Sequence, residues 1–255
     1  MHKTVYPALN VLNNIENGIA AGVYDGELAE TWTERMTMKR VVDEKEKKAR
    51  GGDTVAMRTL AQWYEEGAND LPPDNKKAND WRQVAGWREM ADNGDVGAMY
   101  NLGEVFRKGS HSQKRDGIES YKWYEKASDE GCVRGTAYVG FNKVYGIGTR
   151  KNVGVGLMLL MSAAKDGSDV GCFYLGKFYY FGKYGVGKNV KKAKFWLNLA
   201  VEPSAHIHMK ARNIKRAREW IGEIEKEEEE SSSEEEEESS SDEEMEVDSS
   251  DDEED

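Results

Sequence analysis

Two histidines near the C-terminal end have the residue type of a metal site but not its spacing. His206 and His208 are two residues apart, and imidazole is a common zinc ligand. On a helix, residues i and i+2 point about 200° apart, so the two rings would not face one ion. No cysteine or third histidine lies nearby in the sequence. We therefore expect solvated histidines, with no metal and no other cofactor.

Two Gly-x-Gly pairs have the residue type of a phosphate loop, because backbone N–H groups in glycine-rich turns bind anions. Gly146 and Gly148 form one pair, and Gly185 and Gly187 form the other. Neither pair continues as GxGxxG or as Gly-Lys-Ser/Thr, and neither follows a strand pattern. We interpret both as turns between helices. No nucleophile–base pairing stands out either, so we assign no catalytic residue and no small-molecule substrate, and we predict that the protein is not an enzyme.

The segment 227–255 has the chemistry of a kinase substrate. It contains 19 Asp or Glu residues, no Lys or Arg and no aromatic residue, so it cannot bury enough apolar surface to fold and is predicted to be disordered. Each serine has Asp or Glu three residues later, the preference of an acidophilic kinase resembling casein kinase two, and each phosphate would add about −1.5 to −2 charges. The candidate phosphorylation sites are Ser231, Ser232, Ser233, Ser239, Ser240, Ser241, Ser249 and Ser250.

Three roles for this acidic segment remain open. It could bind basic partners such as histones or ribosomal proteins, or fold back on the basic residues of 188–194 and 210–218. The simplest role is a solubilising tail, because Coulomb attraction alone is unspecific and is screened by salt.

The chain that precedes the acidic segment contains a sequence repeat. The stretch from Gly94 to Gly109 occurs four times, with glycine at offsets 0 and 15, Leu or Val at offset 8 and Gly or Ala at offset 9. The copies begin at Gly52, Gly94, Gly131 and Gly167, so the periods are 42, 37 and 36 residues. A period in this range predicts a solenoid of helical repeats.

Each copy predicts two helices, A and B, joined by a glycine turn and a loop. Helix A has an apolar stripe at offsets 4, 5, 8 and 12, which faces inward, and its small residue at offset 9 lets another helix approach closely. The loop of the first copy, around residues 71–74, is interpreted as longer than the others. Helix B carries a large residue four positions before an alanine, with the first pair displaced by an insertion. The pairs are Trp87 and Ala91, Trp123 and Ala127, Leu160 and Ala164, and Trp196 and Ala200.

These patterns divide the chain into four parts. Residues 1–51 are predicted to form an N-terminal helical cap or degenerate repeat. Residues 52–202 contain the four repeats, at about 52–93, 94–130, 131–166 and 167–202. Residues 203–226 are predicted to form a basic amphipathic helix whose isoleucines, among them Ile221 and Ile224, dock on the last repeat. The acidic segment 227–255 follows.

At this level of detail the repeat is similar to a known family. The pattern Ala98-x-x-x-Leu102-Gly103-x-x-Phe106-x-x-Gly109, followed by a second half that starts at Trp123, resembles the Sel-one-like repeat, a relative of the tetratricopeptide repeat. The resemblance covers about residues 52–202 as four units, and the third departs most, with Lys143 in place of an aromatic residue. It implies an all-α superhelix that assembles protein complexes without catalysis of its own.

The analogy with tetratricopeptide repeats places offsets 3, 6, 10 and 13 of helix A on the concave side. Along the array these positions change from polar to aromatic and cationic, and aromatic residues and arginine dominate binding hot spots. The alternative is that the last aromatic residues of this row pack under the C-terminal helix. The candidate groove residues are Arg58, Gln62, Tyr100, Glu104, Arg107, Arg134, Phe141, Phe173, Lys177 and Tyr180.

The charge distribution limits the classes of partner that we expect this chain to bind. The formal net charge is −12, yet residues 1–226 carry 36 basic and 29 acidic residues, a net charge of +7. Direct nucleic-acid binding is disfavoured, because the attached carboxylates would compete with phosphate. No segment approaches 18 consecutive apolar residues, and Cys132 and Cys172 occupy different offsets, as expected for reduced residues in or near a core. We therefore expect an intracellular protein, cytoplasmic or nuclear, with no membrane partner.

Two functional hypotheses follow. The first is a non-catalytic scaffold that binds a protein or peptide, of unknown identity, along the concave helix-A face. The second is an acidic-tailed, chaperone-like protein in which residues 227–255 bind basic partners. Deletion of residues 227–255 distinguishes them, because only the second hypothesis predicts that the partner is then lost.

Overall fold

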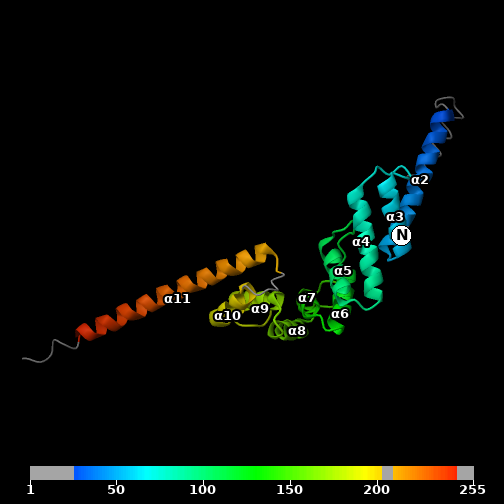
Figure 1. The fold of residues 1–255 in the computed structure, drawn as a ribbon. Coiled ribbons are helices and arrows are strands. Elements are labelled where there is room, and N and C mark those ends of the chain that lie inside the picture. The colour runs from blue at the N-terminus through cyan, green and yellow to red at the C-terminus, as the bar shows by residue number, and fades with distance from the viewer. Residues whose placement is uncertain (1–25, 203–208, 246–255) are drawn as a thin grey trace, which may run out of the picture. The chain divides into compact units, whose positions relative to one another are not determined.

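The computed structural model describes residues 26–202 and 209–245, and these residues form ten α-helices and no strand (Figure 1). The predicted all-α repeat fold is confirmed. The chain divides into two compact units, Met1–Asp116 and Gly117–Asp255. The division falls inside the second predicted repeat, between its two helices, and each unit is described separately below.

The first unit contains α2 (Gly26–Arg50), α3 (Thr54–Glu66), α4 (Asn75–Asp92) and α5 (Val96–Lys108). Helix α2 packs on α3, α3 on α4 and α4 on α5. Among the residues of α2 whose burial is described, Val42 and Ala49 are buried. This helix therefore covers one side of α3. Residues 1–25 of the predicted N-terminal cap lie outside the described residues.

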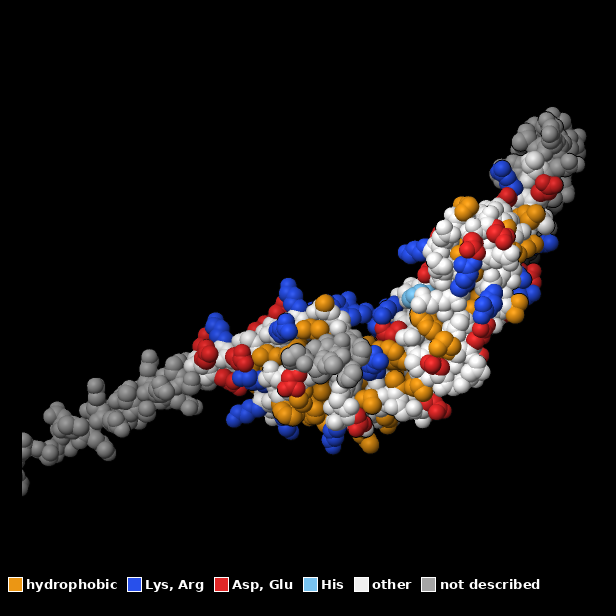
Figure 2. Space-filling view, viewed as in Figure 1, with side chains coloured by type: hydrophobic (Ala, Val, Ile, Leu, Met, Phe, Trp, Pro, Cys, Tyr) orange, Lys and Arg blue, Asp and Glu red, His pale blue; other side chains and the backbone are white. Residues whose placement is uncertain are grey.

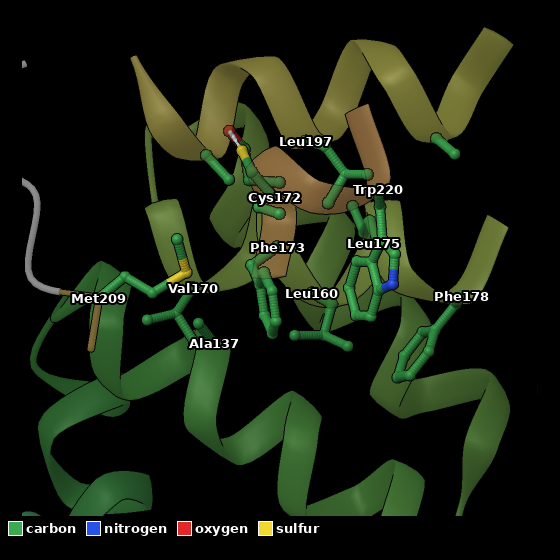
Figure 3. Close-up of a cluster of buried hydrophobic side chains, with 14 of the residues drawn as sticks. Ala137, Leu160, Val170, Cys172, Phe173, Leu175, Phe178, Leu197, Met209 and Trp220 are labelled. Atoms are coloured by element: carbon green, nitrogen blue, oxygen red, sulfur yellow. Dashed lines mark hydrogen bonds between the residues drawn. The ribbon is translucent and has the colours of Figure 1, made fainter. Parts of the chain in front are cut away.

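The second unit places its core between successive helix pairs and the C-terminal helix. Leu160, Phe178 and Leu197 are almost completely buried in it, together with Phe173 and Trp220 (Figure 3). The helices are α6 (Gly117–Asp129), α7 (Val133–Tyr145), α8 (Val153–Lys165), α9 (Asp169–Phe181), α10 (Val190–Val201) and α11 (Ala211–Met245).

Each helix A begins with a side chain that accepts the backbone N–H three residues later, which satisfies one of the otherwise unpaired donors of the first turn. Asp53, Asp95 and Ser168 cap α3, α5 and α9 in this way. In α7 the same position is Cys132, whose Sγ accepts the N–H of Gly135 at 3.4 Å. Cys132 is thus a half-exposed cap, whereas Cys172 is buried as predicted, and both are free thiols.

Each A–B loop is closed by one repeated hydrogen bond. The residue that precedes helix B donates its N–H to the carbonyl at offset 12 of helix A, and a left-handed glycine such as Gly109 (φ 67°) ends helix A just before the loop. A Cβ at Gly109 would lie 2.9 Å from the Arg115 nitrogen, so the turn requires glycine. The four bonds join Asp74 to Tyr64 (2.7 Å), Asp116 to Phe106 (2.9 Å), Asn152 to Lys143 (2.8 Å) and Asn189 to Tyr179 (2.9 Å).

These bonds correct the predicted register of the first helix B. Its loop is no longer than those of the second and fourth repeats, because Asp74 follows Gly67 by the usual seven residues. The insertion lies instead in α4, which has 18 residues where α6 has 13. Counted from the start of the helix, Trp81 and Ala85 match Trp123 and Ala127, and both are buried. The assignment of Trp87 and Ala91 was therefore wrong.

The third repeat shows the opposite deviation. Asn152 follows Gly146 by only six residues, so its loop is one residue shorter than the others. Counted from the start of helix B, Leu160 matches Leu197 of α10 and not Trp196. Both leucines pack against the small residue of their own helix A, Gly140 or Gly176. The prediction that offset 9 permits a close helix approach is confirmed, whereas the pairing of Leu160 with Trp196 was wrong by one position.

The C-terminal helix is longer than predicted. Disorder was expected from Glu227, whereas α11 continues to Met245, and residues 246–255 lie outside the described residues. Glutamate has a high helix propensity, and Lys226 pairs with Glu230 along the helix at 3.5 Å. Lys194 of α10 also binds Glu225 at 3.5 Å and Glu228 at 2.7 Å, so the beginning of the acidic run is attached to the last repeat.

Candidate protein-binding surface

In the first unit, the predicted groove residues of α3 lie on an exposed polar surface. The Arg58 guanidinium donates to both carboxylate oxygens of Glu89, at 3.1 and 2.6 Å, and these hydrogen bonds lower the pKa of Glu89. The Gln62 amide donates to Glu66 at 2.9 Å. Beside them Val55 is 71% exposed. On the face drawn in Figure 2, basic and acidic side chains are interspersed over this unit.

The predicted groove residues of α5, namely Tyr100, Glu104 and Arg107, are half-buried. Arg107 donates twice to Glu104, at 2.7 and 2.6 Å, and Lys108 reaches the same carboxylate at 2.5 Å. On this short surface, two cations converge on one carboxylate. The surface combines an aromatic ring with a guanidinium, the two groups that are most enriched in binding hot spots.

The α7 residues lie in the second unit, where aromatic side chains begin to surround the row. Arg134 and Phe141 are both half-buried. The Phe141 ring lies 4.6 Å from Tyr145 of its own helix and 4.6 Å from Tyr174 of α9. Phe141 therefore bridges two successive A helices, and only part of its ring remains open to a partner.

The α9 residues meet the C-terminal helix. Phe173 is 4% exposed and stacks on Trp220 of α11, with ring centroids 5.9 Å apart, and the close-up shows the indole directed at this ring (Figure 3). The Tyr180 ring stacks on the same indole at 5.6 Å. Phe173 is therefore a core residue and not an open groove residue. The alternative that the last aromatic residues pack under the C-terminal helix holds for this position.

Trp220 is the residue of this surface that the sequence reasoning missed. Alongside Ala217, Ile221 and Ile224 it forms the buried stripe of α11, and all four are at most 8% exposed. Ile221 and Ile224 lie as predicted. The signal for Trp220 was present, because it follows Ala217 by three residues and precedes Ile224 by four, which places it on the same helix face.

Polar contacts surround this aromatic stack. The Tyr180 hydroxyl donates to the Glu223 carboxylate, and this hydrogen bond raises the pKa of Tyr180 to about 12. Lys177, between Phe173 and Tyr180 on α9, is half-buried. Burial lowers the pKa of its ammonium, and the positive charges of Lys183 and Arg216 lower it further. The part of the predicted groove that the fourth repeat contributes is thus electropositive, and α11 of the same chain already occupies it.

The Gly-x-Gly pairs interpreted as turns lie between helices where the structure describes them. Gly146, Gly148 and Gly185 all have positive φ in turns between helices. Over residues 26–202 and 209–245, no group of three His, Cys, Asp or Glu side chains is arranged to hold a metal ion. None of the helices in these ranges combines the length and the apolarity that crossing a bilayer requires. His206 and His208 lie outside the described residues.

Comparison with known proteins identifies the repeat. The family model described as "Sel1 repeat" matches residues 54–83, 96–132 and 170–202. No residue of the helix pair α7 and α8, which has the shortened loop, lies in these segments. No curated protein sequence matches the chain.

Two solved structures are similar. A protective antigen of uropathogenic Escherichia coli with an SLR fold is 26% identical over 63% of this chain and 33% of the antigen, with a TM-score of 0.42. This chain therefore spans about a third of the antigen's length. A Sel1 repeat protein from Oxalobacter formigenes is 21% identical over 74% of this chain and 79% of that protein, also with a TM-score of 0.42.

Sel1 repeats are in general protein-interaction modules, and the proteins that contain them are generally non-catalytic scaffolds. The three matched segments lie on the helix pairs that share one loop length, seven residues from the glycine that ends helix A to the residue before helix B. The chain therefore carries Sel1 repeats over three segments, residues 54–83, 96–132 and 170–202.

Proposed function

We propose that this protein is a non-catalytic scaffold that binds a segment of a partner protein along the helix-A face of its repeats. The docking of α11 on α9 carries the proposal. An amphipathic helix lies on this face of the last repeat, and its tryptophan stacks on the residues at offsets 6 and 13. This face can therefore hold a helix, and the same offsets in the first unit form the proposed partner-binding surface.

The chemistry of the first unit supports a charged partner segment. Arg58 and Gln62 on α3 take the places of Phe173 and Lys177, while Tyr100 and Arg107 on α5 take those of Phe173 and Tyr180. This surface presents the two guanidinium groups of Arg58 and Arg107 and the aromatic ring of Tyr100. Such a surface favours a ligand that has carboxylates beside an apolar side chain. Charged groups at such a surface contribute more to specificity and association rate than to affinity.

A charge-reversal pair tests the proposal. Full-length protein and the variant Arg58→Glu/Arg107→Glu would be used for affinity capture, with quantitative mass spectrometry of the bound proteins. The matched control, Lys76→Glu/Lys114→Glu, makes the same change of charge on exposed lysines of the same unit. We expect a defined partner to be lost from the first variant and retained by the control. Equal recovery of every bound protein by both variants would refute the proposed surface.

The acidic helix supports the second candidate, a chaperone-like protein for basic partners. Glu227, Glu228, Glu229 and Glu230 are exposed on α11 and continue into a long run of acidic residues. Such a segment attracts basic proteins over a range set by the ionic strength. Deletion of residues 227–255 should leave partner capture intact if the repeats bind, and should abolish it if the acidic segment binds. Intact capture after the deletion would reject the chaperone function.

A further inference from the structure

Three positively charged side chains lie beside the Trp220 indole, which stacks on Phe173 and Tyr180 of α9. Lys177 comes from α9, Lys183 from the turn that follows it and Arg216 from α11; we call them the cationic cluster. The Lys183 ammonium lies 5.1 Å from the centre of the Phe181 ring, and the Arg216 guanidinium lies 5.8 Å from the centre of Trp220. The aromatic rings thus hold two of these cations around the half-buried third.

No carboxylate neutralises this cluster among the residues that the structure describes. None of its three members forms an ion pair there. The carboxylates of α11 nearby have other partners, because Glu219 faces Lys215 at 3.8 Å and Glu223 accepts the Tyr180 hydroxyl. The two like charges and the burial all lower the pKa of Lys177, and no negative charge raises it. An incoming anion would relieve this repulsion without having to displace an existing partner.

The chain itself carries a segment of the complementary charge. Residues 227–255 contain 19 acidic and no basic residues. They do not reach their own cluster, because α11 separates Arg216 from Met245 by 29 residues of helix, about 44 Å at 1.5 Å per residue. Residues 246–255, even fully extended, span at most about 35 Å. At the start of the segment, Glu228 binds Lys194, and Glu227 lies near Tyr180.

We propose that the cationic cluster binds the acidic segment 227–255 of a second copy of this chain. Carboxylates of the segment would form charge-assisted hydrogen bonds with Lys177, Lys183 and Arg216, of which Arg216 can bind a carboxylate through two N–H groups. Two copies that exchange segments reciprocally form a closed dimer with twofold symmetry. Because the contact is electrostatic and near the surface, the dimer dissociates as ionic strength rises. This association is independent of partner binding by the first unit.

Sedimentation velocity of the full chain at about 50 mM and about 500 mM salt tests the proposal, since these concentrations differ about threefold in screening length. We expect a dimer at low salt and a monomer at high salt. The variant Lys177→Gln/Lys183→Gln/Arg216→Gln should weaken dimerisation at low salt by about tenfold, the effect of losing three partly exposed charge pairs. The control Lys165→Gln/Lys188→Gln/Lys191→Gln removes three exposed, unpaired lysines of the same unit and should change it by less than about twofold.

A second measurement identifies the occupant. A fluorescein-labelled synthetic peptide of residues 227–255 would be titrated with a chain that lacks these residues. Binding that the cluster substitutions weaken and the control substitutions do not supports the proposal. Equal weakening by both variants would mean unspecific charge attraction and would overturn it. The proposal also fails if the full chain is monomeric at low salt, or if the shortened chain still forms dimers.

Discussion

The indole of Trp220 stacks on the phenyl ring of Phe173, with centroids 5.9 Å and planes 19° apart. The two residues are 47 positions apart in the sequence, one on the last helix A and one on the C-terminal helix. Their contact closes the apolar side of the last repeat, which no further repeat covers. It also decides which of the predicted groove residues remain accessible.

Trp220→Ala should release α11 from the last repeat. Replacing a buried tryptophan by alanine lowers the free energy of unfolding by about 3–5 kcal/mol. The loss here cannot exceed the free energy with which α11 docks on the repeat. Hydrogen exchange of the amides in residues 211–224 should accelerate, and denaturant unfolding should shift to lower concentration. Phe195→Ala is the control, since that ring is 57% exposed on α10 and should cost less than about 1 kcal/mol. Unchanged exchange in α11 of Trp220→Ala would show that the stack does not hold the helix.

Tyr180 should make the attachment of α11 sensitive to alkaline pH. Its hydroxyl donates to Glu223, and its pKa rises from the ordinary value of 10.0 to about 12 in the folded chain. A raised folded pKa means that the stabilisation is complete below pH 10 and is lost as the pH rises from 10 to 12. The stability difference between wild type and Tyr180→Phe should therefore shrink over this interval, as measured by urea unfolding at each pH. A constant difference across it would argue against the hydrogen bond.

Gly140→Ala should destabilise the third repeat. A Cβ there would lie 2.9 Å from the Gly156 carbonyl oxygen and 3.0 Å from the Leu160 nitrogen, both backbone atoms of α8. Overpacking of this kind costs about 1–3 kcal/mol, which outweighs the gain of about 1 kcal/mol in helix propensity.

The matched substitution is Gly86→Ala in α4, where a Cβ would have nothing within 4 Å. It should stabilise the protein by up to about 1 kcal/mol through helix propensity alone. Thermal unfolding of both variants distinguishes packing from propensity. An increase in stability for Gly140→Ala would contradict the close approach of α7 and α8.

Cys132→Asp should stabilise the chain. The equivalent caps of the other A helices are Asp53, Asp95 and Ser168, whereas the Cys132 sulfur accepts the Gly135 N–H only at 3.4 Å. An oxygen acceptor at the N-cap improves stability by about 0.5–1 kcal/mol, and a carboxylate also interacts favourably with the helix dipole. Chemical denaturation would show this gain, and Cys132→Ala should show none. Equal stability of the two variants would mean that the cap at α7 contributes little.

Phosphorylation of the acidic segment should strengthen its binding to the cationic cluster. Every serine of residues 227–255 has an acidic residue three positions later, and each phosphate adds about −1.5 to −2 charges. An acidophilic kinase resembling casein kinase two should modify several of them, as counted by mass spectrometry of the treated chain. The modified peptide should then bind the shortened chain more tightly than the unmodified one. Weaker binding after modification would argue against electrostatic recognition.

Part of the architecture was predictable because it depends on neighbours in the sequence. The glycines at offsets 0 and 15, the small residue at offset 9 and the apolar stripe of Ala98, Leu102 and Phe106 are all recognised from spacings within one helix or turn. The register of helix B was not predictable in the same way. Trp81 and Trp87 each precede an alanine by four residues, and only the bond from Asp74 to Tyr64 shows that Trp81 is the repeat position.

The sequence by itself determined that the chain consists of paired helices, where each helix A lies, and which of its residues share a face. Local periodicity and capping suffice for that, because they act over a few residues. The tertiary structure alone decided what covers each face. Arg58 and Phe173 occupy the same offset, yet one is exposed and paired with Glu89 while the other is buried beneath Trp220. The difference comes from Trp220, 47 residues further along the chain, and helix periodicity carries no information over that distance.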